Sequence, residues 1–256
     1  MSIVEPEAPH RYPLIGKVRA VLVGRLQPSK RPGHWTGISK QAVDGPVPVG
    51  PLGLEGDEQG DTKVHGGVDK AVHVYAHAHY AYWRQELAGN ALALERLHTE
   101  GAFGENLSLD ALDGATLDEQ TVCIGDQWRV GPSTILEVTQ GRQPCWKLND
   151  RFGQPDMAAR LQRSLRPGWY LRVLKTGTIT AGDDIHLLRR AHPEWALGRL
   201  MALIDSRSTD TRALREVLTL PLPPSWKRLF DKRLATGEAE AWSNRMEGPA
   251  GFPPSP

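Results

Sequence analysis

The chain contains little cysteine. Only Cys123 and Cys145 occur among its 256 residues. Two cysteines cannot form a disulfide framework, a four-cysteine zinc site or an all-cysteine iron–sulfur cluster within one chain. Cys123 lies in the apolar run "TVCIGD", where a buried cysteine behaves as a small hydrophobic residue. Cys145 instead follows a turn and has charged neighbours, so it is the candidate for chemistry.

The sequence also lacks long apolar runs and a large net charge. No apolar run approaches the roughly 18 residues that a membrane helix needs, and the N-terminus lacks the regions of a signal peptide. The 31 basic and 30 acidic residues give a net charge of +1, so the whole chain is not attracted to nucleic acid or to an anionic membrane. We therefore expect a cytoplasmic protein with no membrane and no nucleic-acid partner.

Short β-branched runs fill the chain between residues 15 and 188, separated by glycine, proline and aspartate. They are "GKVRAVLVG", "AVHVY", "DQWRVG", "TILEVTQ", "WYLRVLK" and "DIHLL". This spacing favours a β-barrel or sandwich over a βαβ fold. The stretch "HAHYAYWRQEL" places Tyr80, Trp83 and Leu87 on one face of a helix. We therefore predict a mainly β domain with at least one flanking helix.

The composition changes after residue 190, where three amphipathic segments follow. Their apolar stripes are Leu197, Leu200, Met201 and Ile204; Leu214, Val217 and Leu218; and Trp226, Leu229, Phe230 and Leu234. Asp210 and Ser225 are the expected helix starts, and "LPLPP" is expected to be a connection. We predict a barrel domain at 12–190 and a small three-helix domain at 192–245. Residues 1–11 and 247–256 are expected to be flexible termini.

A three-helix domain raises the possibility of a DNA-binding helix-turn-helix. The third segment carries four basic side chains, which are Lys227, Arg228, Lys232 and Arg233. Acidic neighbours such as Asp231 and Glu238 dilute this charge, and the apolar residues occupy the other face. A solvated basic face is therefore the preferred interpretation.

Cys145 lies between Arg142 and Lys147 in "TILEVTQGRQPCWKLND". A cysteine reacts or binds a metal as its thiolate, which cationic neighbours favour. Pro144 fixes its own φ and restrains the residue before it, so the loop presents the thiol in a defined direction. A half-buried loop cysteine beside ordinary surface charges is the competing interpretation, because "CWK" alone is not a strong motif.

A glycine-rich stretch at residues 52–75 forms a second candidate site. Glycines flanking His65 allow positive φ, and successive N–H groups in such a turn can bind an anion. Lys63, His65 and Lys70 add positive charge, although a simple hairpin would explain the glycines equally well. The nearby His73, His77 and His79 straddle an expected strand–helix boundary and lack a supporting metal motif, so a zinc site is disfavoured.

The stretch "GAFGENLSLDAL" brings Glu105 and Asn106 into an apolar segment. Both side chains need partners if they are buried. They either fix a loop or hold a polar ligand, and the sequence alone leaves both interpretations open.

Several ordered motifs together resemble a known family. "GLEGDEQGDTKVHGGVDKAVHVY", "AFGENLS", "IGDQWRVG", "VTQGRQPCWKLN", "GWYLRV" and "AGD" occur in the order typical of the MOSC domain, the β-barrel found at the C-terminus of molybdenum cofactor sulfurases. The chain is most similar to the bacterial subgroup known for resistance to 6-N-hydroxylaminopurine, whose members carry a small C-terminal three-helix domain. The resemblance covers residues 12 to about 245.

The resemblance implies a molybdenum cofactor, a molybdopterin, whose metal is bound by the Cys145 thiolate. A soft sulfur ligand suits such a metal. Cations and backbone donors would then hold the cofactor's phosphate. The candidates are Lys40, Lys63, His65, Lys70, Arg142 and Lys147, with Asn106 as a hydrogen-bonding partner of the pterin or an oxo ligand.

The implied reaction is the reductive removal of the hydroxyl from N-hydroxylated substrates such as 6-N-hydroxylaminopurine, which would detoxify base analogues. His65 is the hypothetical proton donor. The chain has neither an iron–sulfur motif nor a GxGxxG fingerprint, so an external reductase must supply electrons. The alternative is a cofactor-binding or sulfur-carrier protein that uses a Cys145 persulfide, although no pyridoxal-phosphate domain accompanies it. A homodimer is compatible with either function.

Overall fold

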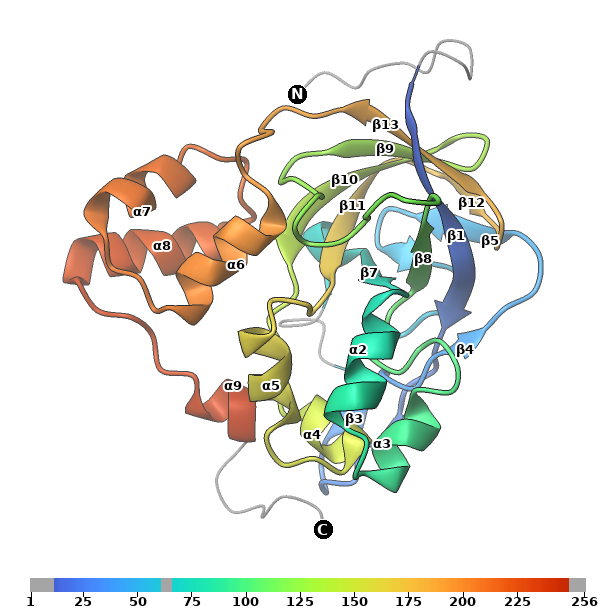
Figure 1. Cartoon of the computed structure of the whole chain (residues 1–256), viewed down its shortest axis with the longest axis horizontal. Helices are drawn as coiled ribbons and strands as arrows, with labels where there is room; N and C mark the ends of the chain where they lie inside the picture. The colour runs from blue at the N-terminus through green and yellow to red at the C-terminus, as the bar shows by residue number, and fades with distance from the viewer. Residues whose placement is uncertain (1–11, 61–65, 249–256) are drawn as a thin grey trace.

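The structure is a computed structural model that describes residues 12–60 and 66–248 (Figure 1). The strands are β1 Leu14–Val23, β2 Gln27–Pro28, β3 Trp35–Thr36, β4 Gln41–Ala42, β5 Val47–Gly50, β6 Gly53–Leu54, β7 Val72–Ala76, β8 Leu107–Ala111, β9 Gln127–Val130, β10 Thr134–Gly141, β11 Trp169–Lys175, β12 Gly177–Ile179 and β13 Asp184–Arg189. The helices are η1 Val68–Lys70, α2 His79–Glu86, α3 Ala91–Arg96, α4 Lys147–Phe152, α5 Met157–Arg163, α6 Leu197–Asp205, α7 Thr211–Val217, α8 Pro224–Thr236 and α9 Ser243–Glu247.

Seven of the described strands form a closed β-barrel. Their order is β13-β9-β10-β11-β7-β8-β1, and pairing of β13 with β1 closes the ring. Neighbouring strands are antiparallel except for β7 and β8, which run parallel. The barrel with flanking helices confirms the predicted fold class, and the six β-branched runs all lie in barrel strands. Strand β8 is the seventh barrel strand and was not expected from the sequence.

Strand β10 shows how the barrel is covered on its outside. All eight of its residues are buried, because α6 packs on the face that the barrel interior does not use. Gly141 ends this strand, and a Cβ atom there would collide with the Met201 side chain of α6. Glycine at this position therefore lets the helix lie against the strand immediately before the Cys145 segment.

An aromatic cluster lies between the barrel and helices α2 to α5. Tyr75 stacks on Phe103 with ring centroids 4.2 Å apart, and Phe103 contacts Phe152 at 5.1 Å. Trp83 donates an indole hydrogen bond of 2.8 Å to the Tyr75 hydroxyl. Tyr80 and Trp83 are buried on the inner face of α2, as the periodicity predicted.

The three C-terminal amphipathic segments are helices α6, α7 and α8, whose apolar residues join the same hydrophobic core as the barrel. Asp210 caps α7 as predicted, because its side chain accepts a hydrogen bond from the Arg212 N–H. The predicted start of α8 at Ser225 is wrong, and so is the expectation that all of "LPLPP" is a connection. The helix begins at Pro224, because proline suits the first helical position, where no N–H is needed.

Arg233 does not belong to the basic face expected on α8. Its side chain is buried, with an exposed fraction of 1%. It pairs with the Glu240 carboxylate at 2.7 Å and donates to the Leu203 carbonyl at 2.8 Å. The guanidinium therefore ties α8 to the end of α6, and the exposed basic face loses one of its four members.

None of the helices in the described ranges combines the length and the apolar character needed to cross a bilayer.

Candidate functional site

Cys145 lies in a short connection between β10 and α4, which we call the Cys145 loop (residues 142–146). The Arg142 N–H donates to the Gly168 carbonyl at 2.9 Å, and the Arg142 guanidinium donates to the Phe103 carbonyl at 2.8 Å. At the other end of the loop, the Leu148 N–H donates to the Cys145 carbonyl at 3.0 Å. These contacts fix the thiol at the junction of the barrel and the helices.

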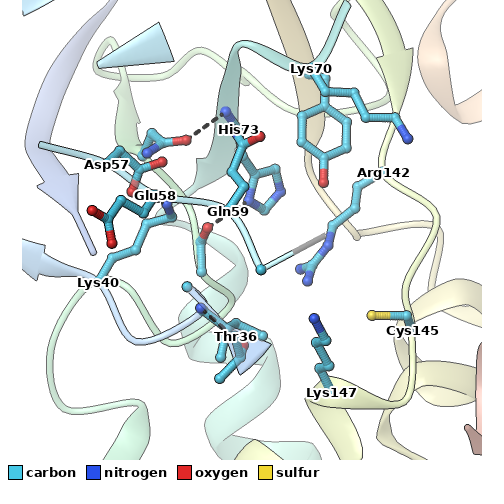
Figure 2. Close-up of a pocket in the computed structure, with 16 residues that line it drawn as sticks. Thr36, Lys40, Asp57, Glu58, Gln59, Lys70, His73, Arg142, Cys145 and Lys147 are labelled. Atoms are coloured by element: carbon cyan, nitrogen blue, oxygen red, sulfur yellow. Dashed lines mark hydrogen bonds and ion pairs between the residues drawn. The ribbon is translucent and has the colours of Figure 1, made fainter. Parts of the chain in front are cut away.

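The thiol faces a pocket that we call the cysteine pocket, which encloses about 560 Å³ of space partly open to solvent. Figure 2 shows the Cys145 sulfur, the Arg142 guanidinium and the Lys147 ammonium directed toward the same part of this pocket. The other lining residues are Thr36, Gly37, Ile38, Lys40, Asp57, Glu58, Gln59, Gly60, Lys70, His73, Gly104, Asn106 and Tyr170. Segments far apart in sequence therefore meet around the thiol.

Three predicted cations, Arg142, Lys147 and Lys70, lie on the thiol side of the pocket. Arg142 is buried, whereas Lys147 is half-buried and donates to the Trp35 carbonyl at 2.8 Å. Burial lowers the pKa of Lys70, while the charges of Asp69 and Cys145 raise it. The Lys70 ammonium lies 5.9 Å from the centre of the Tyr170 ring. The thiol thus has several positively charged neighbours, as its sequence context indicated.

Lys40 and Asn106 also line the pocket, but both have partners within the protein. The Lys40 ammonium forms an ion pair with Asp57, and both side chains are buried. The Asn106 side chain accepts a hydrogen bond from the His73 N–H at 3.1 Å and donates one to the Leu22 carbonyl at 3.2 Å. Asn106 therefore joins β1, β7 and β8. These contacts leave less of either side chain for a ligand than the sequence suggested.

Glu105, the neighbour of Asn106, fixes the loop before β8. Its fully buried carboxylate accepts hydrogen bonds from the N–H groups of Gly101 at 2.8 Å and Phe103 at 3.1 Å. It also accepts a hydrogen bond from the Tyr80 hydroxyl. The structure therefore gives Glu105 the loop-fixing role that the sequence left open.

His73 and Tyr170 add two ionisable side chains that the sequence analysis did not assign to this site. The pKa of His73 lies well below its usual value because the ring is buried and faces Arg142 and Lys40. Burial raises the pKa of Tyr170, against the charge of Arg142. At neutral pH the pocket is therefore lined by an uncharged imidazole and a protonated phenol. The sequence favoured an ordinary surface or core histidine at position 73 over a zinc ligand. Among the described residues, no group of three His, Cys, Asp or Glu side chains could hold a metal ion.

Two glycines let loops of the pocket wall approach each other closely. A Cβ atom at Gly37 would collide with the Glu58 carbonyl oxygen, and one at Gly60 would collide with the Trp35 carbonyl oxygen. The segments 35–37 and 58–60 can therefore cross without side chains between them. Their backbones, rather than bulky side chains, form this part of the wall.

Residues 242–248 return to the Cys145 loop after the three-helix region, and we call them the C-terminal strap. Figure 1 shows α9 of this strap beside α5 and apart from the other C-terminal helices. The Trp146 N–H donates to the Arg245 carbonyl at 2.8 Å, and the Arg245 guanidinium donates to the Pro144 carbonyl at 2.6 Å and to Gln162 at 2.7 Å. Burial lowers the pKa of Arg245, and the charge of Cys145 opposes this shift. No local motif marks Arg245 as part of the site.

The end of the strap contacts two side chains near α4. The Asn149 side chain donates to the Met246 carbonyl at 2.8 Å, and Arg31 donates to the Glu247 carbonyl at 2.8 Å. These contacts hold Met246 and Glu247 against α4, because buried amide and guanidinium groups need acceptors. Residues 249–256 lie outside the described part of the chain, and so do residues 1–11.

The structure thus gathers most of the predicted site residues in one pocket. Cys145, Lys40, Lys70, Asn106, Arg142 and Lys147 all line it. The predicted Lys63 and His65 lie outside the described residues.

Comparisons with known proteins agree with this architecture. The MOSC domain matches residues 61–186, and the YiiM-like 3-alpha helix domain matches residues 195–237. Protein YiiM of Escherichia coli is 35% identical over 93% of this chain and 99% of its own length. A protein of Gibberella moniliformis named Reductase is 37% identical over 87% of this chain, which spans only 38% of that longer protein.

The fold comparison leads to the same family. The crystal structure of YiiM from Escherichia coli matches with a TM-score of 0.74 and 30% identity, covering 92% of this chain and 100% of the other. The sequence relationship therefore extends through the barrel and the C-terminal helices alike. The chain belongs to the MOSC domain family, in the YiiM-like group that carries a C-terminal three-helix domain.

Proposed function

We propose that the protein is a molybdenum-cofactor-dependent reductase that removes the hydroxyl group from N-hydroxylated substrates such as 6-N-hydroxylaminopurine. The observation that supports this most is the Cys145 thiol, which faces a pocket beside Arg142 and Lys147. The MOSC family membership and the name of the fungal relative, Reductase, agree with a redox activity.

The residues of the pocket fit the cofactor that the family implies. A thiolate is a suitable ligand for a metal that prefers sulfur. Arg142, Lys147 and Lys70 provide cations for a phosphate, and the crossing of segments 35–37 and 58–60 leaves backbone groups exposed to a ligand. Lys40 contributes less charge, because Asp57 neutralises its ammonium group.

The bound cofactor would supply the two electrons that cleave the N–O bond. The overall conversion takes a hydroxylamine, two electrons and two protons to an amine and water. Tyr170 and Lys70 lie close to each other in this pocket and both carry protons, so they are candidates to supply the protons of this conversion. Arg142 is held by the Phe103 carbonyl, so its guanidinium keeps a fixed orientation toward the ligand. His65 remains a predicted proton donor.

We further propose that electrons come from a separate reductase, because the sequence has no iron–sulfur or GxGxxG motif. We propose the three-helix region as the docking surface for this partner; the alternative role of the region is packing or a homodimer contact. The proposed domain limits remain 12–190 for the barrel and 192–245 for the helical domain.

The test uses protein purified from a host that makes molybdenum cofactor. Molybdenum content is measured by elemental analysis, and reduction of 6-N-hydroxylaminopurine to 6-aminopurine is followed with reduced methyl viologen as the electron source. We expect near-stoichiometric metal and turnover. Protein without metal, from a host that loads another molybdenum enzyme, would contradict the proposal and favour the sulfur carrier with a Cys145 persulfide.

A further inference from the structure

A second pocket adjoins the cysteine pocket and shares Thr36, Ile38 and Lys147 with it. It encloses about 600 Å³ of space, part of which is open to solvent. Its wall combines residues 27–30, the segment 36–39, the end of α3 and the start of α4. The proposed function assigns no role to most of these residues.

The second pocket is rich in cations. Four basic side chains line it, namely Lys30, Arg96, Lys147 and Arg151, together with the hydroxyls of Ser29, Thr36 and Ser39. Lys30 and Arg96 are exposed, and no acidic side chain within the described residues forms an ion pair with either of them. The pocket therefore has positive charge that the described chain does not neutralise.

The one carboxylate among the lining residues, Asp150, does not balance these cations. It is buried and pairs with Arg31, whose guanidinium donates to it at 2.9 and 3.0 Å. The Arg31–Asp150 pair is neutral as a whole. The charge presented to a ligand therefore comes from the other four side chains.

Arg151 forms a fixed base for the second pocket. Its guanidinium donates to the carbonyls of Ala102 at 2.6 Å and Gly101 at 2.8 Å, and to the Ser39 hydroxyl at 2.9 Å. Burial lowers the pKa of Arg151 to about 10, and the positive charge of Arg96 contributes to this shift. An anion bound between Arg96 and Arg151 would relieve this repulsion.

We propose that the second pocket is a binding site for a phosphate monoester, carried by a ligand whose other end lies beside Cys145. Phosphate suits several cations and hydroxyl donors that converge on one space. Because Lys147 belongs to both pockets, one ligand can span them. The identity of this ligand rests on the proposed function. A nucleotide form of the N-hydroxylated base would place its base near Cys145 and its phosphate near Arg96.

Binding of adenosine 5′-monophosphate and of adenosine to the purified holoprotein, measured by calorimetry at low and high salt, tests the site. The two probes differ only in the phosphate. We expect the monophosphate to bind at least about tenfold more tightly at low salt, and this preference to shrink as salt screens the charges.

The variants Lys30→Gln and Arg96→Gln should each weaken binding of the monophosphate about threefold, and the double variant about tenfold, because each removes one exposed charge. Adenosine binding should not change. Arg228→Gln, which removes an exposed arginine from α8, is the matched control and should leave both affinities unchanged.

Molybdenum content of the same variants shows which ligand carries the phosphate. If the double variant loses molybdenum while the control retains it, the phosphate belongs to the cofactor. If molybdenum is retained and the monophosphate preference falls, the phosphate belongs to the substrate. The proposal is overturned if the double variant matches the control in both measurements. The binding measurement does not depend on reductase activity. A failed reductase assay would therefore contradict the proposed function without contradicting the phosphate site.

Discussion

Cys145 and Cys123 are both buried, with exposed fractions of 8% and 2%, but their electrostatic surroundings differ. Cys145 shares a pocket with Arg142 and Lys147. At Cys123, burial raises the pKa of the thiol, and the negative charge of Asp126 raises it further against the positive charge of Arg190. Asp126 also accepts a hydrogen bond from the Cys123 N–H at 3.1 Å. Neighbouring charge and access to a pocket, rather than burial, therefore distinguish Cys145, the proposed functional thiol, from Cys123.

The largest difference between the two cysteines should appear in metal content. Cys145→Ala should remove essentially all bound molybdenum and the reductase activity, because it removes the proposed ligand. Cys123→Ala should keep both and lower the free energy of unfolding by about 1 kcal/mol, the cost of a small packing defect. Elemental analysis and chemical denaturation of both variants provide the measurements. Equal metal loss in the two variants would contradict the assignment of Cys145, and not Cys123, as the metal ligand.

The second expected difference between the two cysteines is the reactivity of their thiols. With cofactor-free protein at pH 7, iodoacetamide should modify Cys145 about tenfold or more faster than Cys123, because cations favour the reactive thiolate and acidic neighbours oppose it. Peptide mass spectrometry gives the two rates from one sample. Comparable rates would show that the charge around the Cys145 loop does not reach the sulfur.

A change in the C-terminal strap should reduce the difference in alkylation rate between Cys145 and Cys123. Arg245→Met removes a cation and the hydrogen bonds to Pro144 and Gln162, so the reactivity advantage of Cys145 should fall about threefold. Arg245→Lys, which keeps the charge, should restore part of it. The same alkylation assay measures both variants. If the lysine variant behaves like the methionine variant, the strap acts through loop geometry alone.

Acid should change the stability of the folded protein rather than the reactivity of a thiol, and through a group on the Cys145 side of the molecule. The unfolded chain binds a proton at His73 near pH 6.5, whereas the folded protein does not, because its His73 pKa lies well below that value. The free energy of unfolding is therefore fully retained above pH 6.5. Below it, we expect a loss of up to about 1.4 kcal/mol per pH unit.

Denaturation curves between pH 7 and pH 5 measure this slope. His73→Gln should flatten it, and the exposed His98→Gln is the matched control that should leave it unchanged. A slope that is identical in His73→Gln and in the original chain would show that other groups carry the acid sensitivity.

The parts of the fold that the sequence predicted have local signals. The β-branched runs became barrel strands, and the apolar stripe through Tyr80 and Trp83 became α2. Strand β8 was not expected, because the polar residues Glu105 and Asn106 directly precede it and its pairing with β7 joins segments distant in sequence. The expected start of α8 at Ser225 was wrong because a proline-rich stretch can end in the first residue of a helix, as Pro224 does here.

The candidate site also contains some residues that local sequence predicts and others that only the tertiary structure brings together. Arg142 and Lys147 lie within three residues of Cys145, so the sequence places them near the thiol. Tyr170 and Arg245 reach the same place only through the closure of the barrel and the return of the strap. The ion pair of Lys40 with Asp57 also depends on tertiary structure, which explains why Lys40 looked like a free cation in the sequence.

The C-terminal strap has a consequence for the order in which the protein is made. Arg245 follows Pro144, its hydrogen-bond partner, by 101 residues. Translation therefore produces the complete Cys145 loop and the last barrel strand before any strap residue exists. Since chains begin to fold from the N-terminus during synthesis, a nascent barrel passes through a stage in which the Cys145 loop lacks the hydrogen bonds that join Trp146 and Pro144 to Arg245. The loop therefore acquires its final support only when synthesis of the chain is nearly finished.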